Sequence, residues 1–414
     1  MNPSFPPGAN PSENGPTQPF AGETPAQNSF QPAQPRRRRW LIPVVVGLVA
    51  VAAFAVGVGA VMLWPKKHNG YAGPVGVAPR YIVNPIIAVG HNPTDVVVDP
   101  QSHAIYVANS DDDSISVIDG TTYAVTTTIT GIKAPYRLAL NSAKHVLYAT
   151  TDSDDGARGT VVVVDTVANK VVTTVPVGVN PKGIACDPER GLIYVVNQNL
   201  DPNPPDEQHL YATNPGSVSV IDGATNSVVQ TIGMGRGPEY TALDANAHRL
   251  YVSNEIEHSI AVVDTMAGTV VANIEVGEAP IGVTVDPDTH TLYVANLVGS
   301  SVSVVDTQTN TVRRTLQVSR YPRVVVVDKV RKTIYVAHTA PGSDPDATVS
   351  ADAIDATTFG LVPVPGVGTD PNSVAVDVGN GAVFVADARD AKVYVVKPCY
   401  TCAALSSTST APTK

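Results

Sequence analysis

Three histidines and one glutamate have the chemistry of ligands for a catalytic metal. Imidazole and carboxylate groups such as those of His91, His258, His338 and Glu255 bind divalent cations that activate water. A metal-assisted hydrolase or lyase of the lactonase kind would need several of these side chains within a few ångströms of one another. The elements that carry them therefore decide whether a metal site exists.

Six basic residues form a second candidate set, which could bind an anionic ligand. Arginine forks and lysine ammonium groups recognise carboxylate and phosphate oxygens. Ordinary charged surface loops are the alternative interpretation. The six residues are Lys133, Arg137, Lys182, Arg236, Arg320 and Arg323.

An internal repeat sets the elements that position these residues. The unit from Pro280 to Val318 has four short alternating or β-branched runs, each closed by turn residues, which predicts a four-stranded antiparallel sheet. Successive units open 42, 46, 57, 42, 42 and 49 residues apart, a spacing typical of propeller blades. The opening residues are Pro93, Pro135, Pro181, Pro238, Pro280, Pro322 and Pro371.

The second strand of each unit carries a recurring motif. It reads Ile-Tyr-Val-Ala-Asn at 105–109, Leu-Tyr-Val-Ser-Asn at 250–254 and Leu-Tyr-Val-Ala-Asn at 292–296. On these residues the chain resembles the YVTN-type, or YncE-like, β-propeller repeat family. The resemblance covers residues 81–398 and implies an all-β, seven-bladed β-propeller of four-stranded antiparallel blades. It implies no single activity, because propellers host many unrelated functions.

The last unit lacks a fourth strand of its own. It ends at Val396, whereas the leading stretch Ile86–Gly90 resembles the fourth-strand ending Asn273–Gly277. We therefore expect an N-terminal strand to complete the last blade and to close the ring, which leaves no open strand edge.

The repeat also separates turn residues from candidate site residues. Four histidines, His103, His145, His248 and His290, share one register position in blades that point in different directions, so they cannot form one metal site. Eleven aspartates end first or third strands, where a side-chain oxygen can cap the turn. They are Asp99, Asp119, Asp165, Asp187, Asp222, Asp244, Asp264, Asp286, Asp306, Asp328 and Asp377.

The remaining propeller histidines are predicted to lie in loops on one face of the ring. These are His91, His209, His258 and His338, in loops that join fourth to first or second to third strands. We call this side the funnel face. The six basic residues are assigned to its fourth-to-first loops, nearest the axis, because first strands are innermost.

The N-terminal region predicts a membrane anchor. Residues 1–39 are a proline-rich stretch that ends in four arginines and is expected to be disordered. Residues 40–65 are predicted to be a transmembrane helix, since no charged side chain occurs from Trp40 to Trp64. A cleavable signal peptide is the rival interpretation, disfavoured by the length and position of the apolar run. The preceding arginines favour a cytoplasmic N-terminus and an extracytoplasmic propeller.

Short segments flank the propeller. Residues 66–80 are expected to form a flexible tether, and residues 399–414 a frayed C-terminal tail. Cys399 and Cys402 form a Cys-x-x-Cys pair, for which a local disulfide is expected in an oxidising compartment.

These observations favour a binding or scaffolding module of the cell envelope over an enzyme. Its partner would be an envelope protein or a small anionic ligand at the funnel face, and no cofactor is predicted, with a divalent metal on that face as the alternative. The resemblance also suggests single-strand nucleic-acid binding as a second alternative, but a net charge of −10 disfavours it.

Overall fold

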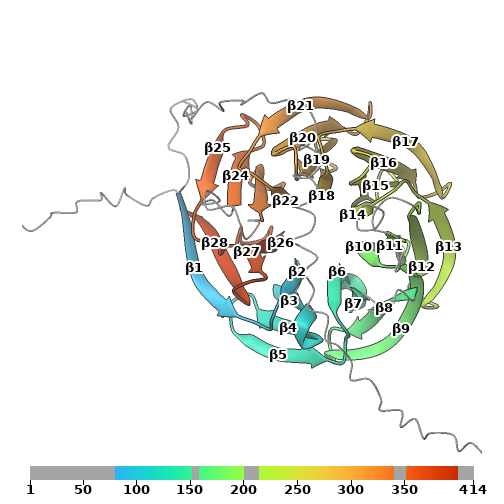
Figure 1. Ribbon diagram of the computed structural model, residues 1–414. Coiled ribbons are helices and arrows are strands. Elements are labelled where there is room, and N and C mark those ends of the chain that lie inside the picture. The colour runs from blue at the N-terminus through green and yellow to red at the C-terminus, as the bar shows by residue number, and fades with distance from the viewer. Residues whose placement is uncertain (1–79, 152–157, 200–213, 340–350, 400–414) are drawn as a thin grey trace, which may run out of the picture. The chain divides into compact units, whose positions relative to one another are not determined.

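The computed structural model describes residues 80–151, 158–199, 214–339 and 351–399. In this part of the chain, strands form seven four-stranded antiparallel sheets, each opened by a repeat proline. Figure 1 shows the sheets arranged as blades around a central axis, with the first strand of each blade innermost. The seven-bladed propeller predicted from the repeat is confirmed.

Blades one to four have the following strands, in chain order from the axis outward. Blade one has β2 (Pro93–Val98), β3 (Ala104–Asn109), β4 (Ser114–Asp119) and β5 (Val125–Thr130). Blade two has β6 (Pro135–Asn141), β7 (Val146–Thr151), β8 (Arg158–Asp165) and β9 (Lys170–Val179). Blade three has β10 (Pro181–Asp187), β11 (Leu192–Asn197), β12 (Ser217–Asp222) and β13 (Ser227–Gly233). Blade four has β14 (Pro238–Asp244), β15 (Arg249–Asn254), β16 (Ser259–Asp264) and β17 (Thr269–Glu275).

Blades five to seven complete the ring. Blade five has β18 (Pro280–Asp286), β19 (Thr291–Asn296), β20 (Ser301–Asp306) and β21 (Thr311–Gln317). Blade six has β22 (Pro322–Asp328), β23 (Thr333–His338), β24 (Ala351–Asp355) and β25 (Leu361–Val364). Blade seven has β26 (Pro371–Val376), β27 (Val383–Asp387), β28 (Lys392–Cys399) and β1 (Arg80–Ala88), in the order β26-β27-β28-β1. Two short 3₁₀ turns, Ser110–Asp112 and Ser142–Lys144, follow β3 and β6.

The core of the propeller lies between neighbouring blades. Second and third strands are buried on both faces, so both sets of alternating side chains are apolar or small. Between blades five and six, for example, Tyr293 and Val304 pack against Val325, Ile334 and Val336. Outermost strands such as β21 are largely exposed and carry polar residues. A single sheet could not bury both of its apolar faces, and the ring provides each blade with a neighbour on either side.

The ring is closed by the N-terminal strand, as the repeat predicted. Strand β1 pairs antiparallel with β28, and Figure 1 shows the blue strand on the outer edge of the red blade. Ile87 is buried beside Phe384 and Val393, whereas Ile86 is exposed. The first strand of this blade, β26, contacts β2 of blade one. Chain ends far apart in the sequence thus hold one blade together.

The turns use the aspartates expected from the repeat. The carboxylate of Asp328 accepts hydrogen bonds from the backbone amides of Val330 and Arg331 at 3.1 and 3.0 Å, and Asp306 caps its hairpin in the same way. The hairpin residue Asn310 is left-handed, with φ 54°. Asparagine tolerates this conformation, so these polar residues have a structural explanation that does not involve catalysis.

The predicted anchor, residues 40–65, and the proline-rich stretch 1–39 lie outside the described residues, as do residues 66–79 of the predicted tether and 400–414 of the predicted C-terminal tail. The remaining residue of each segment, Arg80 and Cys399, belongs to strands β1 and β28. Among the residues that are described, none forms a helix long and apolar enough to cross a membrane.

Candidate functional site

The candidate site is formed by the two residues that follow each repeat proline. These residues open the innermost strands, so the corresponding positions of all seven blades face one another around the axis. The first position is Thr94, Tyr136, Lys182, Glu239, Ile281, Arg323 and Asn372, and the second is Asp95, Arg137, Gly183, Tyr240, Gly282, Val324 and Ser373. Side-chain chemistry therefore varies from blade to blade where the rest of the repeat is nearly constant.

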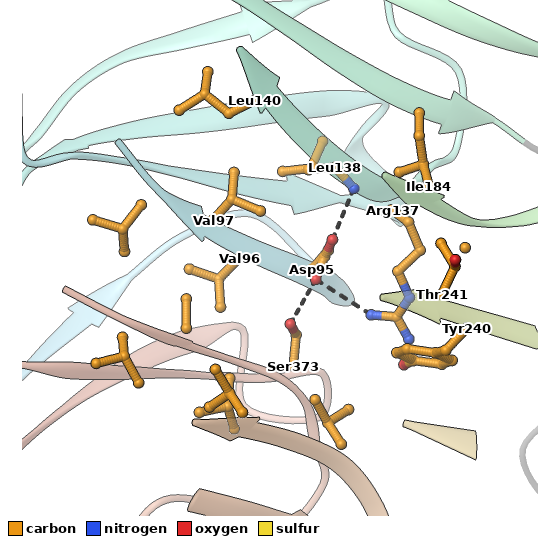
Figure 2. Close-up of a pocket in the computed structure, with 17 residues that line it drawn as sticks. Asp95, Val96, Val97, Arg137, Leu138, Leu140, Ile184, Tyr240, Thr241 and Ser373 are labelled. Atoms are coloured by element: carbon orange, nitrogen blue, oxygen red, sulfur yellow. Dashed lines mark hydrogen bonds and ion pairs between the residues drawn. The ribbon is translucent and has the colours of Figure 1, made fainter. Parts of the chain in front are cut away.

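Cationic and aromatic side chains alternate in this ring. The Cζ atom of Arg137 lies 4.2 Å from the ring centroid of Tyr240 and 4.8 Å from that of Tyr136. The ammonium nitrogen of Lys182 lies 4.4 Å from the Tyr136 centroid. Such cation–π contacts gain strength where water is excluded. Blades two, three and four are therefore connected near the axis, and Figure 2 shows Arg137 beside Tyr240.

Arg137 also ties blade two to blades one and seven. Its Nη1 atom donates to the carbonyl oxygen of Thr94 at 2.5 Å, to Asp95 Oδ1 at 3.4 Å and to the carbonyl oxygen of Asn372 at 3.4 Å. Asp95 accepts two further hydrogen bonds, from the Leu138 amide at 2.7 Å and from Ser373 Oγ at 2.6 Å (Figure 2). Burial raises the pKa of Asp95, and the Arg137 charge opposes that shift.

The backbones of neighbouring first strands approach closely beside these side chains. A Cβ atom on Gly183 would lie 2.8 Å from the carbonyl oxygen of Glu239, and one on Gly282 would lie 2.6 Å from that of Arg323. Glycine is therefore required where neighbouring first strands meet most closely.

The electrostatics of the site centre on Tyr136. Burial would raise the pKa of Tyr136, but the neighbouring charges of Lys182 and Arg137 lower it below the usual value. Arg323 hydrogen-bonds Tyr136, and the pKa of Arg323 is raised by Tyr136 against the opposing effect of burial. Three cations from three blades thus surround one phenol group.

Two carboxyl groups complete this cluster on the funnel face. Glu239 accepts a hydrogen bond from Gln198. Glu255 follows β15, and its backbone amide donates a hydrogen bond to the Gly237 carbonyl oxygen at 2.8 Å. Burial, with a smaller contribution from Glu239, raises the pKa of Glu255 to about 8, while Arg323 and Lys182 oppose this shift. Glu255 is therefore mainly protonated at neutral pH. We call Tyr136, Arg137, Lys182, Glu239, Glu255 and Arg323 the funnel cluster.

Several polar atoms of the site lack partners. Within the described residues, Arg137 Nε, Arg323 Nε and the Tyr240 hydroxyl have no hydrogen-bond partner. All three groups can donate a hydrogen bond. Since an unmade hydrogen bond of a buried group costs free energy, a ligand that brings acceptor oxygens would be favoured here.

A cavity of about 400 Å³ extends from this polar ring along the first strands. Its polar residues are Asp95, Arg137, Tyr240, Thr241 and Ser373. The rest of its wall is glycine and aliphatic residues, which include Val96, Val97, Val98, Leu138, Leu140, Ile184, Val324, Val326, Val374 and Val376. In Figure 2, Val96, Val97 and Leu140 lie on the side of Asp95 away from Arg137, and Ile184 lies on the side of Arg137.

The structure divides the six predicted basic residues into two groups. Arg137, Lys182 and Arg323 come together, but they open first strands and do not lie in the loops predicted from the sequence. That assignment was wrong by one or two residues, because each first strand begins at its proline. The other three are exposed in loops of the described chain, and Arg236 Nε lies 3.6 Å from Glu257 Oε1. They are Lys133, Arg236 and Arg320.

The predicted histidines do not converge. His91 Nδ1 lies 3.0 Å from Asp112 Oδ1 at an exposed position, and His258 Nδ1 accepts from the Ala279 amide at 3.0 Å. His209 lies outside the described residues. Within the described chain, no group of three or more His, Cys, Asp or Glu side chains could hold a metal ion. A metal-dependent hydrolase would need several of these side chains within a few ångströms of one another, and the described residues do not provide such a group.

The assignment of His338 to a loop was also wrong. His338 is the last residue of β23, is buried, and has its Nε2 atom 3.0 Å from Asp352 Oδ2. The equivalent residue in blade five, Asn296, instead donates to Ser301 and Ser303, each at 3.0 Å. A His–Asp pair thus replaces an Asn–Ser arrangement of the repeat. Comparison of register positions between blades could have revealed this exchange.

The predicted disulfide between Cys399 and Cys402 is described at only one of its two cysteines. Cys399 is the last residue of β28 and is disulfide-bonded. Its predicted partner, Cys402, lies outside the described residues, so the pairing stays a prediction.

Fold and site together define a closed, seven-bladed β-propeller with a polar, cation-rich centre. Residues 218–321 match the family model described as lactonase, 7-bladed beta-propeller. The chain is 23% identical over 167 residues to the seven-bladed beta-propeller protein Rv1057 of Mycobacterium tuberculosis. That match covers 40% of this chain and 39% of the relative, so the chain spans well under half of the relative's length.

A solved structure is also similar. A chain of hydrazine synthase from Kuenenia stuttgartiensis superimposes with a TM-score of 0.61 at 18% identity, over 75% of this chain and 96% of that chain. At this identity the likeness shows the fold alone. The narrower resemblance to YVTN-type repeats stays a prediction.

Proposed function

We propose that this protein is a membrane-anchored binding module of the cell envelope whose funnel cluster binds an anionic group of a small ligand or of a partner protein. The observation that carries the proposal is the convergence of Arg137, Lys182 and Arg323 around Tyr136. These cations come from three blades and are far apart in the sequence. Arginine and lysine at such a site favour carboxylate or phosphate oxygens.

Two further features support the binding of an anion. Arg323 Nε has no hydrogen-bond partner in the described residues, and it belongs to the same cluster. Glu255 is mainly neutral near pH 7, because burial raises its pKa to about 8. The negative charge that would oppose an anion is therefore reduced.

Ligand-detected NMR on the full chain in lipid nanodiscs tests this proposal. We expect saturation transfer to acetate, and its loss in Lys182→Gln and Arg323→Gln. The matched control is Arg320→Gln, which changes an exposed arginine in a nearby loop. Equal signals from all four proteins would contradict the assignment of the anion to the funnel cluster.

The membrane anchor is a separate part of the proposal. It is supported by the uncharged segment from Trp40 to Trp64 and by the arginines that precede it. We expect the full chain to stay in the membrane fraction after carbonate extraction, and a chain that lacks residues 40–65 to be released. Protease added outside intact cells should reach the propeller. Retention of the shortened chain in membranes would contradict the anchor.

A hydrolase is the second candidate function. It is favoured by the lactonase family match, because Glu239 and Glu255 both lie within residues 218–321. A carboxyl group that is protonated at neutral pH beside cations could act as a general acid. Turnover of a panel of simple lactones, lost in Glu255→Gln, would favour this candidate over binding alone.

A further inference from the structure

We infer that the central cavity holds the hydrocarbon part of an amphipathic carboxylate, whose head group binds at Arg137 and Tyr240. This inference deepens the proposed function and rests on it, since it assigns the class of ligand. It is carried by the juxtaposition of an apolar wall with donors that lack partners within the described residues.

The first observation is the character of the cavity. Its volume of about 400 Å³ is within the range of small-molecule sites, which are mostly apolar with a few polar groups. The aliphatic wall comes from first strands of different blades, for example Val96, Leu140, Val326 and Val376. The aliphatic lining residues are consecutive in β2 and β26, at 96–98 and 374–376, and are every second residue in β6 and β22. A hydrocarbon of limited length therefore fits the wall better than a polar ligand does.

The second observation is that Arg137 and Tyr240, at the polar end of the cavity, have hydrogen-bond donors without partners in the described residues. Arg137 is 4% exposed and lines the cavity, yet its Nε atom has no hydrogen-bond partner in the described residues. The Tyr240 hydroxyl also lacks a partner there, and the Arg137 guanidinium lies over the Tyr240 ring. Both groups can donate, so the head of the ligand must accept. The positive charge of Arg137 favours an acceptor that is an anion.

The negative charge of Asp95 does not remove the preference of Arg137 for an anionic head group. Its two oxygens already accept hydrogen bonds from the Leu138 amide, from Ser373 Oγ and from Arg137 Nη1. The Nε atom of the Arg137 guanidinium has no such partner in the described residues, so it can donate to a ligand. An ammonium head would meet the like charge of Arg137, and an alcohol would provide a weaker acceptor than a carboxylate.

The depth of the cavity limits the length of the hydrocarbon. A first strand rises about 3.3 Å per residue, so the wall from Asp95 to Val98 is about 10 Å long. This depth fits a medium-length, unbranched chain. Each methylene group that leaves water should increase affinity about fourfold until the cavity is filled.

A homologous series tests the inference on the full chain in lipid nanodiscs, with empty nanodiscs as the reference. Dissociation constants are measured by NMR for acetate, butanoate, hexanoate and octanoate, and for octanol and octylamine. We expect affinity to rise about fourfold per methylene along the carboxylates. Octanol and octylamine should bind at least tenfold more weakly than octanoate.

Two variants and one control locate the ligand. Val326→Phe narrows the cavity and should abolish the dependence on chain length, while Val330→Phe, at a position that is 63% exposed, should leave it unchanged. Tyr240→Phe keeps the aromatic ring and removes only the hydroxyl. It should weaken octanoate binding about tenfold with little change in the unfolding temperature, because the hydroxyl has no partner to lose among the described residues.

The outcomes separate the two proposals. Binding of acetate without a gain along the series would overturn the inference and leave the proposed function standing. Failure of every carboxylate to bind would overturn both. Equal affinity for octanol and octanoate, or no effect of Tyr240→Phe, would contradict the assignment of the head group.

Discussion

The guanidinium of Arg137 lies 4.2 Å from the ring centroid of Tyr240, although the two residues open the first strands of blades two and four. Blade three lies between these two blades, and its residue at the same register position is Gly183, which has no side chain that could block the contact. A side chain at Gly183 would collide with the backbone of Glu239 and Tyr240. The centre of the propeller is therefore connected across blades as well as between neighbours.

Replacement of Arg137 should destabilise the whole ring. Arg137→Met removes hydrogen bonds to Thr94, Asp95 and Asn372 and leaves the buried Asp95 carboxyl without its cation. Loss of one partner from a buried ion pair costs about 3–5 kcal/mol. Urea unfolding would measure the change. Lys329→Met is the control, since the Lys329–Asp288 pair is exposed and should contribute less than about 1 kcal/mol.

Closure of the ring can be tested at two adjacent residues of β1. Ile87 is 6% exposed and packs beside Phe384 and Val393, so Ile87→Ala should cost about 2–5 kcal/mol of unfolding free energy. Ile86 is 52% exposed, and Ile86→Ala should change stability by less than about 0.5 kcal/mol. Thermal unfolding of both variants is the measurement. Equal shifts would argue against packing of β1 as described.

The aspartates that end the strands should act through stability alone. Asp328 is fully buried and accepts from two backbone amides and from Arg331 Nη1, so Asp328→Ala should cost about 1–3 kcal/mol. Asp288→Ala removes an exposed carboxylate two residues beyond Asp286 and should be close to neutral. Denaturant titration compares the two. Loss of ligand binding in a stable, folded Asp328→Ala protein would contradict a purely structural role.

The raised pKa of Glu255 predicts that stability decreases with pH. The folded protein keeps the proton up to a pKa of about 8, while the unfolded chain releases it near the ordinary value of 4.5. Between these values the unfolded state binds fewer protons, so the free energy of unfolding falls as the pH rises, and the loss is complete above about pH 8. Glu255→Gln should flatten this decline.

Urea unfolding at pH 6, 7, 8 and 9 measures this effect. Glu275→Gln, at an exposed position at the end of β17, provides the control. A decline of the same slope in the Glu255→Gln protein would show that another group is responsible.

The number of blades, their four-stranded form and the closure by β1 could all be predicted from the amino-acid sequence alone. These features depend on local alternation, on turn residues such as Asp306 and Asn310, and on a period that can be counted along the chain. Blade bounds could be predicted to within a few residues for the same reason.

Which side chains meet could be learned only from the folded ring. Tyr136, Lys182 and Arg323 come together because the first strands converge on the axis. His91 and His258 stay apart because the loops that carry them do not converge. The burial of His338 depends on Asp352 in the next strand. The alternating pattern that identifies a strand is the same whether its side chains face a neighbouring blade or the central cavity, so the curvature of the closed ring was needed to distinguish the two.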